Sequence, residues 1–273
     1  MNDDFADLRR AYLRERAKPV PAWVKNEHFS GVRVLHHRPP RQSSRDNCIV
    51  YAHGGGWITG SPETHIDISS ALCRHTGLPV YSVDYRLAPL CHSAEQIEDI
   101  LTVLRGLAGK GVILCGDSAG ASLVAATACA ARGDVCKHIL GLALFYGYFG
   151  LVKDEVYELY CRRVDGLDEA SLSRYLSAAG ESSHRSIFDA VQLSRLSMFP
   201  VHVVAGTRDP LLGSSLSLAE VLRHNGGSVA IDLVQSAGHG FLQDVNSRNS
   251  ANQSFQVLDR WVSTLSNADA APT

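Results

Sequence analysis

The stretch VILCGDSAGASL at residues 112–123 decides how this chain is expected to fold. An apolar run leads into GDSAG at 116–120, and an alanine-rich run follows it. A serine between two glycines at a strand-to-helix turn indicates a sharp bend, because glycines remove the Cβ atoms that would clash there. The N–H groups after the bend lie at a helix N-terminus, where negative charge is favoured. The stretch predicts that Ser118 is a nucleophile beside an anion site, although a glycine-rich turn capped by this serine would use the same residues.

Strand-like and helix-like runs alternate on both sides of this stretch. The strand-like runs are VRVL, CIVYAH, PVYSVDY, GVILCG, HILGLALFYG, VHVVAG and VAIDLV. Their alternation with helical patterns indicates βαβ units and an α/β fold with a mostly parallel sheet. Their nearly continuous hydrophobicity suits strands that are covered on both faces.

Residues 151–190 interrupt the alternation with a polar, helical pattern. Val152, Val156, Leu159 and Tyr160 fall on one face of that pattern. We interpret this segment, together with a helix within about residues 1–25, as a small cap on a single domain that spans residues 1–273. The final stretch, 266–273, is predicted to be a disordered tail.

The composition limits the partners and the compartment. The chain has 273 residues, 45% of them hydrophobic, and a formal net charge of −2, which implies no bulk attraction to nucleic acid. Its start is charged and it has no long apolar run, so we expect a cytoplasmic protein with no membrane span. The seven cysteines include no C-x-x-C pair and are expected to be small buried side chains. No metal site and no cofactor are predicted.

A serine hydroxyl needs a base and a carboxylate that orients the base. His239 lies in QSAGHGF just after the strand-like run VAIDLV, and Asp209 lies in GTRDPLL after VHVVAG. An aspartate before proline also suits an ordinary turn. The order Ser118, Asp209, His239 nevertheless matches the order of the triad in α/β hydrolases.

A glycine run at 53–57, HGGGW, follows the strand-like run CIVYA. Consecutive glycines let a backbone come close to a substrate and turn its N–H groups inward, as the oxyanion of acyl transfer requires. The run predicts an oxyanion loop, and the alternative is a flexible turn.

Five motifs in order resemble the hormone-sensitive-lipase-like group of α/β-hydrolase esterases over about residues 48–262: HGGGW, DYRLAP at 84–89, GDSAGAS, DPLL and GHGF. The resemblance implies an eight-stranded, mostly parallel sheet with helices on both faces and a helical cap. It implies a catalytic triad of Ser118, Asp209 and His239. It further implies oxyanion N–H donors at Gly55, Gly56 and Ala119, and loop support from His53, Gly54, Asp84 and Arg86.

The sequence departs from the pattern of this group at two places. Ala121 stands where a second glycine is common, and LCHSAEQ follows DYRLAP where an acidic residue and prolines are expected. Neither departure affects the triad, but both bear on the acyl pocket and the cap.

The function expected from these residues is a serine carboxylesterase that hydrolyses small, short-chain esters through an acyl-enzyme, with no cofactor, and that could pair as a homodimer. The same triad could serve an amide or formamide hydrolase or a deacetylase. A non-catalytic ligand receptor of this fold is a third possibility, which the presence of His239 disfavours.

Overall fold

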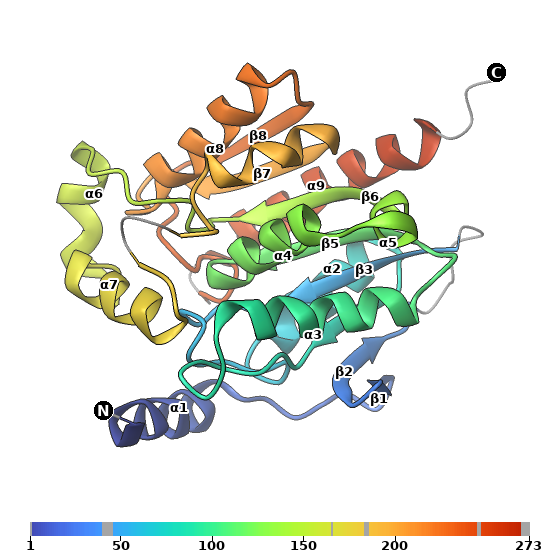
Figure 1. Cartoon of the computed structure of the whole chain (residues 1–273), viewed down its shortest axis with the longest axis horizontal. Helices are drawn as coiled ribbons and strands as arrows, with labels where there is room; N and C mark the ends of the chain where they lie inside the picture. Colours follow the sequence, from blue (N-terminus) through green and yellow to red (C-terminus); the bar gives the residue numbers. More distant parts are fainter. Residues whose placement is uncertain (1, 40–45, 165, 183–185, 245–246, 269–273) are drawn as a thin grey trace.

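The computed structural model describes residues 2–39, 46–164, 166–182, 186–244 and 247–268 (Figure 1). The strands are β1 (Val24–Phe29), β2 (Val32–His37), β3 (Asn47–Ala52), β4 (Val80–Val83), β5 (Gly111–Asp117), β6 (Ile139–Phe145), β7 (Val201–Gly206) and β8 (Val229–Val234). The helices are α1 (Asn2–Arg16), α2 (Ile66–Thr76), α3 (Ser93–Gly106), α4 (Ala119–Ala130), α5 (Gly133–Lys137), α6 (Glu155–Tyr160), α7 (Glu169–Ala178), α8 (Leu212–His224) and α9 (Arg248–Ala268), with 3₁₀ turns η1 (Cys161–Arg163) and η2 (Gln192–Met198).

The strands form one eight-stranded sheet in the order β1-β2-β4-β3-β5-β6-β7-β8. The strands from β4 through β8 pair in parallel, while β2 is antiparallel to both β1 and β4. The predicted α/β fold with a mostly parallel, eight-stranded sheet is therefore confirmed.

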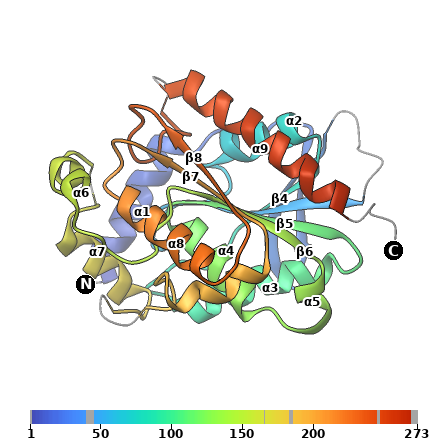
Figure 2. The same ribbon diagram turned by 90° about the horizontal axis from the view of Figure 1, so that it is seen from above.

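Helices cover both faces of this sheet. Along β5, Val112 and Leu114 point to one face and Ile113 and Cys115 to the other, because side chains alternate along a strand. The first face packs against α3, α4 and α8, and the second against α2 and α9 (Figure 2). All four of these β5 side chains are buried, which explains why the strand reads as a continuous apolar run.

The central helix α4 is buried over most of its length. Its alanines carry small side chains, so the helix can lie close to the face of the sheet on which it packs. This close packing fixes where α4 begins, and Ser118 stands at that point.

The sequence did not predict β1. Its residues, VKNEHF, are mostly polar, and it lies at the edge of the sheet with only Val24 buried. Such a strand lacks the apolar alternation by which half-buried strands are recognised.

Two further expectations need correction. Leu159, expected on the apolar face of the 151–190 segment, is 59% exposed, and Tyr157 is buried there instead. The helix α9 extends to Ala268, so residues 266–268 are helical although the disordered tail was predicted to begin at 266. The rest of that predicted tail, 269–273, lies outside the described residues.

The cysteines follow the expectation. All seven are free, and five of them, Cys48, Cys73, Cys91, Cys115 and Cys161, are buried. Across the described ranges, no helix combines the length and the apolar character that crossing a membrane requires.

Candidate active site

The turn at Ser118 joins β5 to α4 and has an unusual backbone. Ser118 has φ 51° and ψ −122°, a conformation that non-glycine residues rarely adopt. Its N–H donates to the carbonyl of Phe145 (2.9 Å), and its carbonyl accepts from the N–H of Ala121 (3.0 Å). These bonds hold the strained residue at the top of the sheet, as a nucleophile elbow requires.

The flanking glycines are needed because the elbow is crowded by backbone. A Cβ on Gly116 would lie 2.5 Å from the carbonyl carbon of Gly120. A Cβ on Gly120 would overlap the carbonyl oxygen of Ala52 and lie 2.6 Å from that of His53. Gly116 thus permits the first turn of α4 to lie against β5, and Gly120 permits it to lie against the end of β3.

Ser118, His239 and Asp209 come from three separate loops and meet at the carboxyl edge of the sheet. The distance from His239 Nε2 to Ser118 Oγ is 2.9 Å, and His239 Nδ1 lies 3.0 Å from Asp209 Oδ2. Asp209 is fully buried and also accepts from the N–H of Leu211 (2.7 Å). The structure therefore brings together all three residues that the sequence proposed as a triad, in a hydrogen-bonded chain.

The electrostatics around His239 favour its charged form. Burial lowers the pKa of His239, but the charge and hydrogen bond of Asp209 and the charge of Asp117 outweigh burial, so this pKa lies above its ordinary value of 6.5. A carboxylate on the far side of the imidazole also fixes which nitrogen faces the serine.

The HGGGW loop follows β3 and passes beside Ser118. Gly55 and Gly56 have φ of 120° and 60°, and the carbonyl of Gly55 accepts from the N–H of Thr59 (2.9 Å). Within the described part of the chain, the N–H groups of Gly55, Gly56 and Ala119 have no acceptor. These three are the N–H groups predicted to face an oxyanion.

Two of the residues expected to support this loop, His53 and Gly54, are part of it and hold its shape. His53 Nδ1 lies 2.8 Å from the carbonyl oxygen of Gly54, and its ring stacks on Tyr85 at 4.3 Å between centroids. The N–H of Gly54 donates to Asp117 Oδ1 (2.9 Å). The Tyr85 hydroxyl donates to the carbonyl of His53 (2.7 Å).

Asp84 and Arg86 have their ion-pair partners outside the loop. Asp84 pairs with Arg33 (2.7 Å) and Arg86 with Asp99 (2.8 Å). The carbonyl of Arg86 accepts from Gln96, whose amide also donates to the carbonyl of Trp57 (2.9 Å each). Gln96, which was not expected from the sequence, therefore ties the Arg86 segment to the loop, in addition to the direct bond from the N–H of Ala88 to the carbonyl of Trp57 (3.0 Å).

The role of Asp117 was not expected from the sequence. This buried carboxylate accepts from Tyr51 Oη (2.5 Å), from the N–H of Gly54 and, more weakly, from Tyr146 Oη (3.4 Å). Burial raises its pKa, although the hydrogen bonds from Tyr51 and Gly54 and the charges of His53 and His239 oppose the rise. Asp117 joins the glycine loop to the elbow. The signal was an acidic residue at the end of an otherwise apolar strand.

A cavity of about 690 Å³ opens over Ser118 and His239. Gly55 and Gly56 form part of its floor, while α1 and α7 supply Tyr12 and Tyr175. The two helices that the sequence placed in a cap therefore line the space in which a substrate would react with Ser118.

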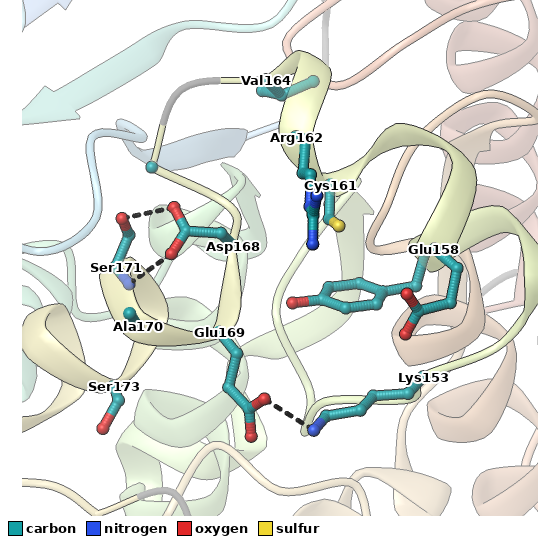
Figure 3. A pocket seen from close by; sticks show the side chains of 12 residues that line it. Lys153, Glu158, Cys161, Arg162, Val164, Asp168, Glu169, Ala170, Ser171 and Ser173 are labelled. Carbon is teal, nitrogen blue, oxygen red and sulfur yellow. Dashed lines mark hydrogen bonds and ion pairs between the residues drawn. The ribbon is translucent and has the colours of Figure 1, made fainter.

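A second hollow lies on the outside of α6, η1 and α7 and measures about 1030 Å³ (Figure 3). Lys153 pairs there with Glu169 (2.6 Å), and Asp168 accepts from the N–H of Ser171 (3.0 Å) as the cap of α7. Lys153 and Glu169 thus neutralise one another, and Asp168 is engaged in capping α7. Neither Ser118 nor His239 lines it, so the smaller cavity is the better place for chemistry.

Among the residues that the structure describes, no three His, Cys, Asp or Glu side chains are grouped so that they could hold a metal ion. The cavity over Ser118 offers a nucleophile, a base and N–H donors, which together suit acyl transfer.

Comparisons with known proteins identify the family of this chain. The model of the family described as "alpha/beta hydrolase fold" matches residues 49–243. An acetyl esterase from Salmonella paratyphi B is 27% identical over 230 residues, which cover 79% of this chain and 71% of the relative. An acetyl esterase from Salmonella typhi is 28% identical over 232 residues with the same coverage.

Solved structures give the same result for the fold. A hormone-sensitive-lipase homologue from a metagenome library has a TM-score of 0.79 at 25% identity, covering 97% of this chain and 93% of the other. An esterase of Pyrobaculum calidifontis has a TM-score of 0.79 at 23% identity, covering 97% and 92%. The resemblance that the motifs predicted is confirmed, and the chain belongs to the family with the alpha/beta hydrolase fold.

Proposed function

We propose that this protein is a carboxylic ester hydrolase that acts through Ser118, His239 and Asp209 and forms an acyl-enzyme. The observation that carries the proposal is the hydrogen-bonded chain from Ser118 Oγ to His239 Nε2 (2.9 Å) and from His239 Nδ1 to Asp209 (3.0 Å). The relatives named acetyl esterases support an ester as the substrate.

The reaction follows from where these atoms lie. Ser118 Oγ attacks the ester carbonyl carbon as its proton passes to His239 Nε2, and the carbonyl electron pair moves onto the oxygen. The N–H groups of Gly55, Gly56 and Ala119 would stabilise that oxyanion. Collapse of the intermediate breaks the bond to the alcohol, which takes the proton from His239. Water then repeats the sequence on the acyl-enzyme and releases the acid.

The proposal is tested by labelling with a fluorophosphonate probe together with hydrolysis of p-nitrophenyl butyrate. An activated serine reacts covalently with the probe, whereas a non-catalytic receptor would not. A matched butyryl p-nitroanilide distinguishes the amide alternative, because the acyl group and aromatic ring are unchanged. Faster turnover of the anilide would replace the esterase proposal with an amidase, and an unlabelled protein would reject both.

The pH dependence of the reaction follows from the pKa of His239. The imidazole must be neutral to accept the Ser118 proton, and its pKa lies above 6.5, so kcat/KM should decline as pH is lowered, with a midpoint above 6.5. The measurement is kcat/KM for p-nitrophenyl butyrate from about pH 5 to 9. Circular dichroism over the same range shows whether the chain stays folded. A flat profile in the folded protein would contradict a histidine base.

The acyl preference follows from the cavity and from the cap, which we propose consists of α1 and residues 151–190. Tyr175 lies against the glycine loop, since a Cβ on Gly56 would be only 3.0 Å from its ring. Each methylene should gain about 0.8 kcal/mol of burial until it meets such a wall, so kcat/KM should peak at acyl chains of about two to six carbons. A series of p-nitrophenyl esters measures this. Rates that keep rising to about twelve carbons, or jump at a lipid interface, would indicate a lipase instead.

Pairing into a homodimer and a cytoplasmic location remain predictions from the sequence.

A further inference from the structure

The lining of the cavity over Ser118 contains two chemically different sets of side chains. Leu8, Val164, Leu167 and Tyr175 are apolar, and we call them the apolar wall. Glu15 and Arg16 at the end of α1, with Gln243 and Asp244, are polar, and we call them the polar wall. The proposed mechanism uses none of the polar side chains, so their presence beside the reacting serine needs another explanation.

The polar wall is held by its own hydrogen bonds. The N–H of Gln243 donates to the carbonyl of Gly240 (2.9 Å), and its side-chain amide donates to the carbonyl of Thr64 (3.0 Å). The amide oxygen of Gln243 is thereby turned toward Arg16, which donates to it (3.2 Å). The Arg16 guanidinium also lies 5.2 Å from the centre of the Tyr12 ring.

Arg16 retains free hydrogen-bonding capacity. A guanidinium has five N–H donors in a fixed fork, and the bond to Gln243 uses one of them. Among the residues that the structure describes, no carboxylate forms an ion pair with Arg16. A positioned guanidinium with unused donors, lining the cavity of the nucleophile, can bind an oxygen atom of a substrate.

The position of His239 indicates which half of an ester meets this wall. The alcohol oxygen must leave beside His239 Nε2, because that nitrogen donates its proton to it. Gln243 belongs to the same loop as His239, one turn further on, whereas Tyr175 packs against Gly56 on the oxyanion side. The alcohol half therefore extends past the polar wall and the acyl half toward the apolar one.

The charges of the wall favour a neutral group. The carboxylates of Glu15 and Asp244 line the cavity beside the single guanidinium of Arg16, so a negatively charged alcohol would meet repulsion as well as attraction. Hydroxyl groups both donate and accept, and they suit a wall that offers both donors and acceptors. Resting on the proposed esterase function, we propose that the alcohol half of the substrate is a neutral, hydroxyl-bearing group bound by Arg16 and Gln243.

The test compares three butyrate esters that share a three-carbon alcohol: n-propyl butyrate, 2,3-dihydroxypropyl butyrate and the butyrate ester of 3-hydroxypropanoate. The wild-type protein should show a kcat/KM for the dihydroxypropyl ester about tenfold or more above that for the propyl ester, as expected for a hydrogen bond to a charged donor. The anionic ester should be hydrolysed more slowly than the dihydroxypropyl ester. Faster hydrolysis of the anionic ester would overturn the choice of a neutral group.

Two variants locate the preference. Arg16→Met keeps a long stem over Tyr12 but removes every donor, and Gln243→Leu removes the amide. Either should bring the ratio of the two kcat/KM values to within about threefold of unity. Arg14→Met, an exposed arginine of the same helix that does not line the cavity, is the matched control and should leave the ratio unchanged. Because both rates come from one preparation, a partly folded variant does not distort their ratio.

Hydrolysis of p-nitrophenyl butyrate separates this inference from the function on which it rests. If that ester is hydrolysed but the wild-type ratio is near unity, the inference is overturned and the esterase proposal stands. A preference that survives in Arg16→Met and Gln243→Leu also overturns it. If no ester is hydrolysed, the esterase proposal fails and the inference fails with it.

Discussion

Ser118→Ala lowers kcat for p-nitrophenyl butyrate by about 10⁴-fold or more while the protein stays folded. The substitution removes the only atom that forms the acyl-enzyme in the proposed mechanism, and comparable losses follow removal of the serine in other triads. Among the described residues, the hydroxyl has one hydrogen-bond partner, His239 Nε2 (2.9 Å), so little stability should be lost.

The measurement pairs kcat with the melting temperature and with fluorophosphonate labelling. Ser173→Ala is the matched control, since Ser173 is an exposed serine of α7 that lies outside the cavity of Ser118. It should keep both activity and labelling. A Ser118→Ala protein that retained more than about a hundredth of the activity would mean that another residue is the nucleophile.

Gly120→Ala is expected to destabilise the protein by about 3 kcal/mol or more. Helix propensity alone predicts the opposite, because alanine is favoured over glycine in a helix by about 1 kcal/mol. The added Cβ, however, would overlap the carbonyl oxygen of Ala52 and lie 2.6 Å from that of His53. Both obstacles are backbone atoms in the centre of the sheet and in the glycine loop, so they cannot move aside cheaply.

Thermal unfolding measures this effect, and a loss of this size lowers Tm by about 6 °C or more. Gly238→Ala is the matched control, because the space around Gly238 can accommodate a Cβ. The nearest heavy atom to that Cβ would be 4.0 Å away. It should change Tm by about 2 °C or less. A Gly120→Ala protein with an unchanged or raised Tm would show that α4 does not pass as close to β3 as the structure has it.

Local patterns in the sequence allowed most of the site to be predicted. The glycines around Ser118 and the run at 53–57 are required by the backbone geometry of a few neighbouring residues. Such local requirements can be recognised directly in the sequence. Asp209 and His239 each follow an apolar strand, and the parallel sheet brings such strand ends to one edge. The fold class followed from the alternation of the same strands with helices.

The remaining features depend on contacts between distant parts of the chain. Asp117 accepts a hydrogen bond from Gly54, which is 63 residues away in sequence. Gln96 donates a hydrogen bond to Trp57, which is 39 residues away. The residues next to Asp117 and Gln96 in sequence do not indicate which distant residue each side chain contacts. Leu159 illustrates the reverse error, because helical spacing assigned it to an apolar face on which Tyr157 is buried in its place.

The helix α1 and the loop of His239 both line the cavity that holds Ser118. Arg16 and Gln243, which meet in one of its walls, are 227 residues apart in sequence. Contacts of such long range carry the largest loop-closure cost and tend to form late in folding. A growing chain on the ribosome would possess the serine for more than a hundred residues before its base is synthesised. Regain of hydrolysis during refolding should therefore follow the slowest tertiary step. The enzyme is expected to be inactive until these distant segments have packed together.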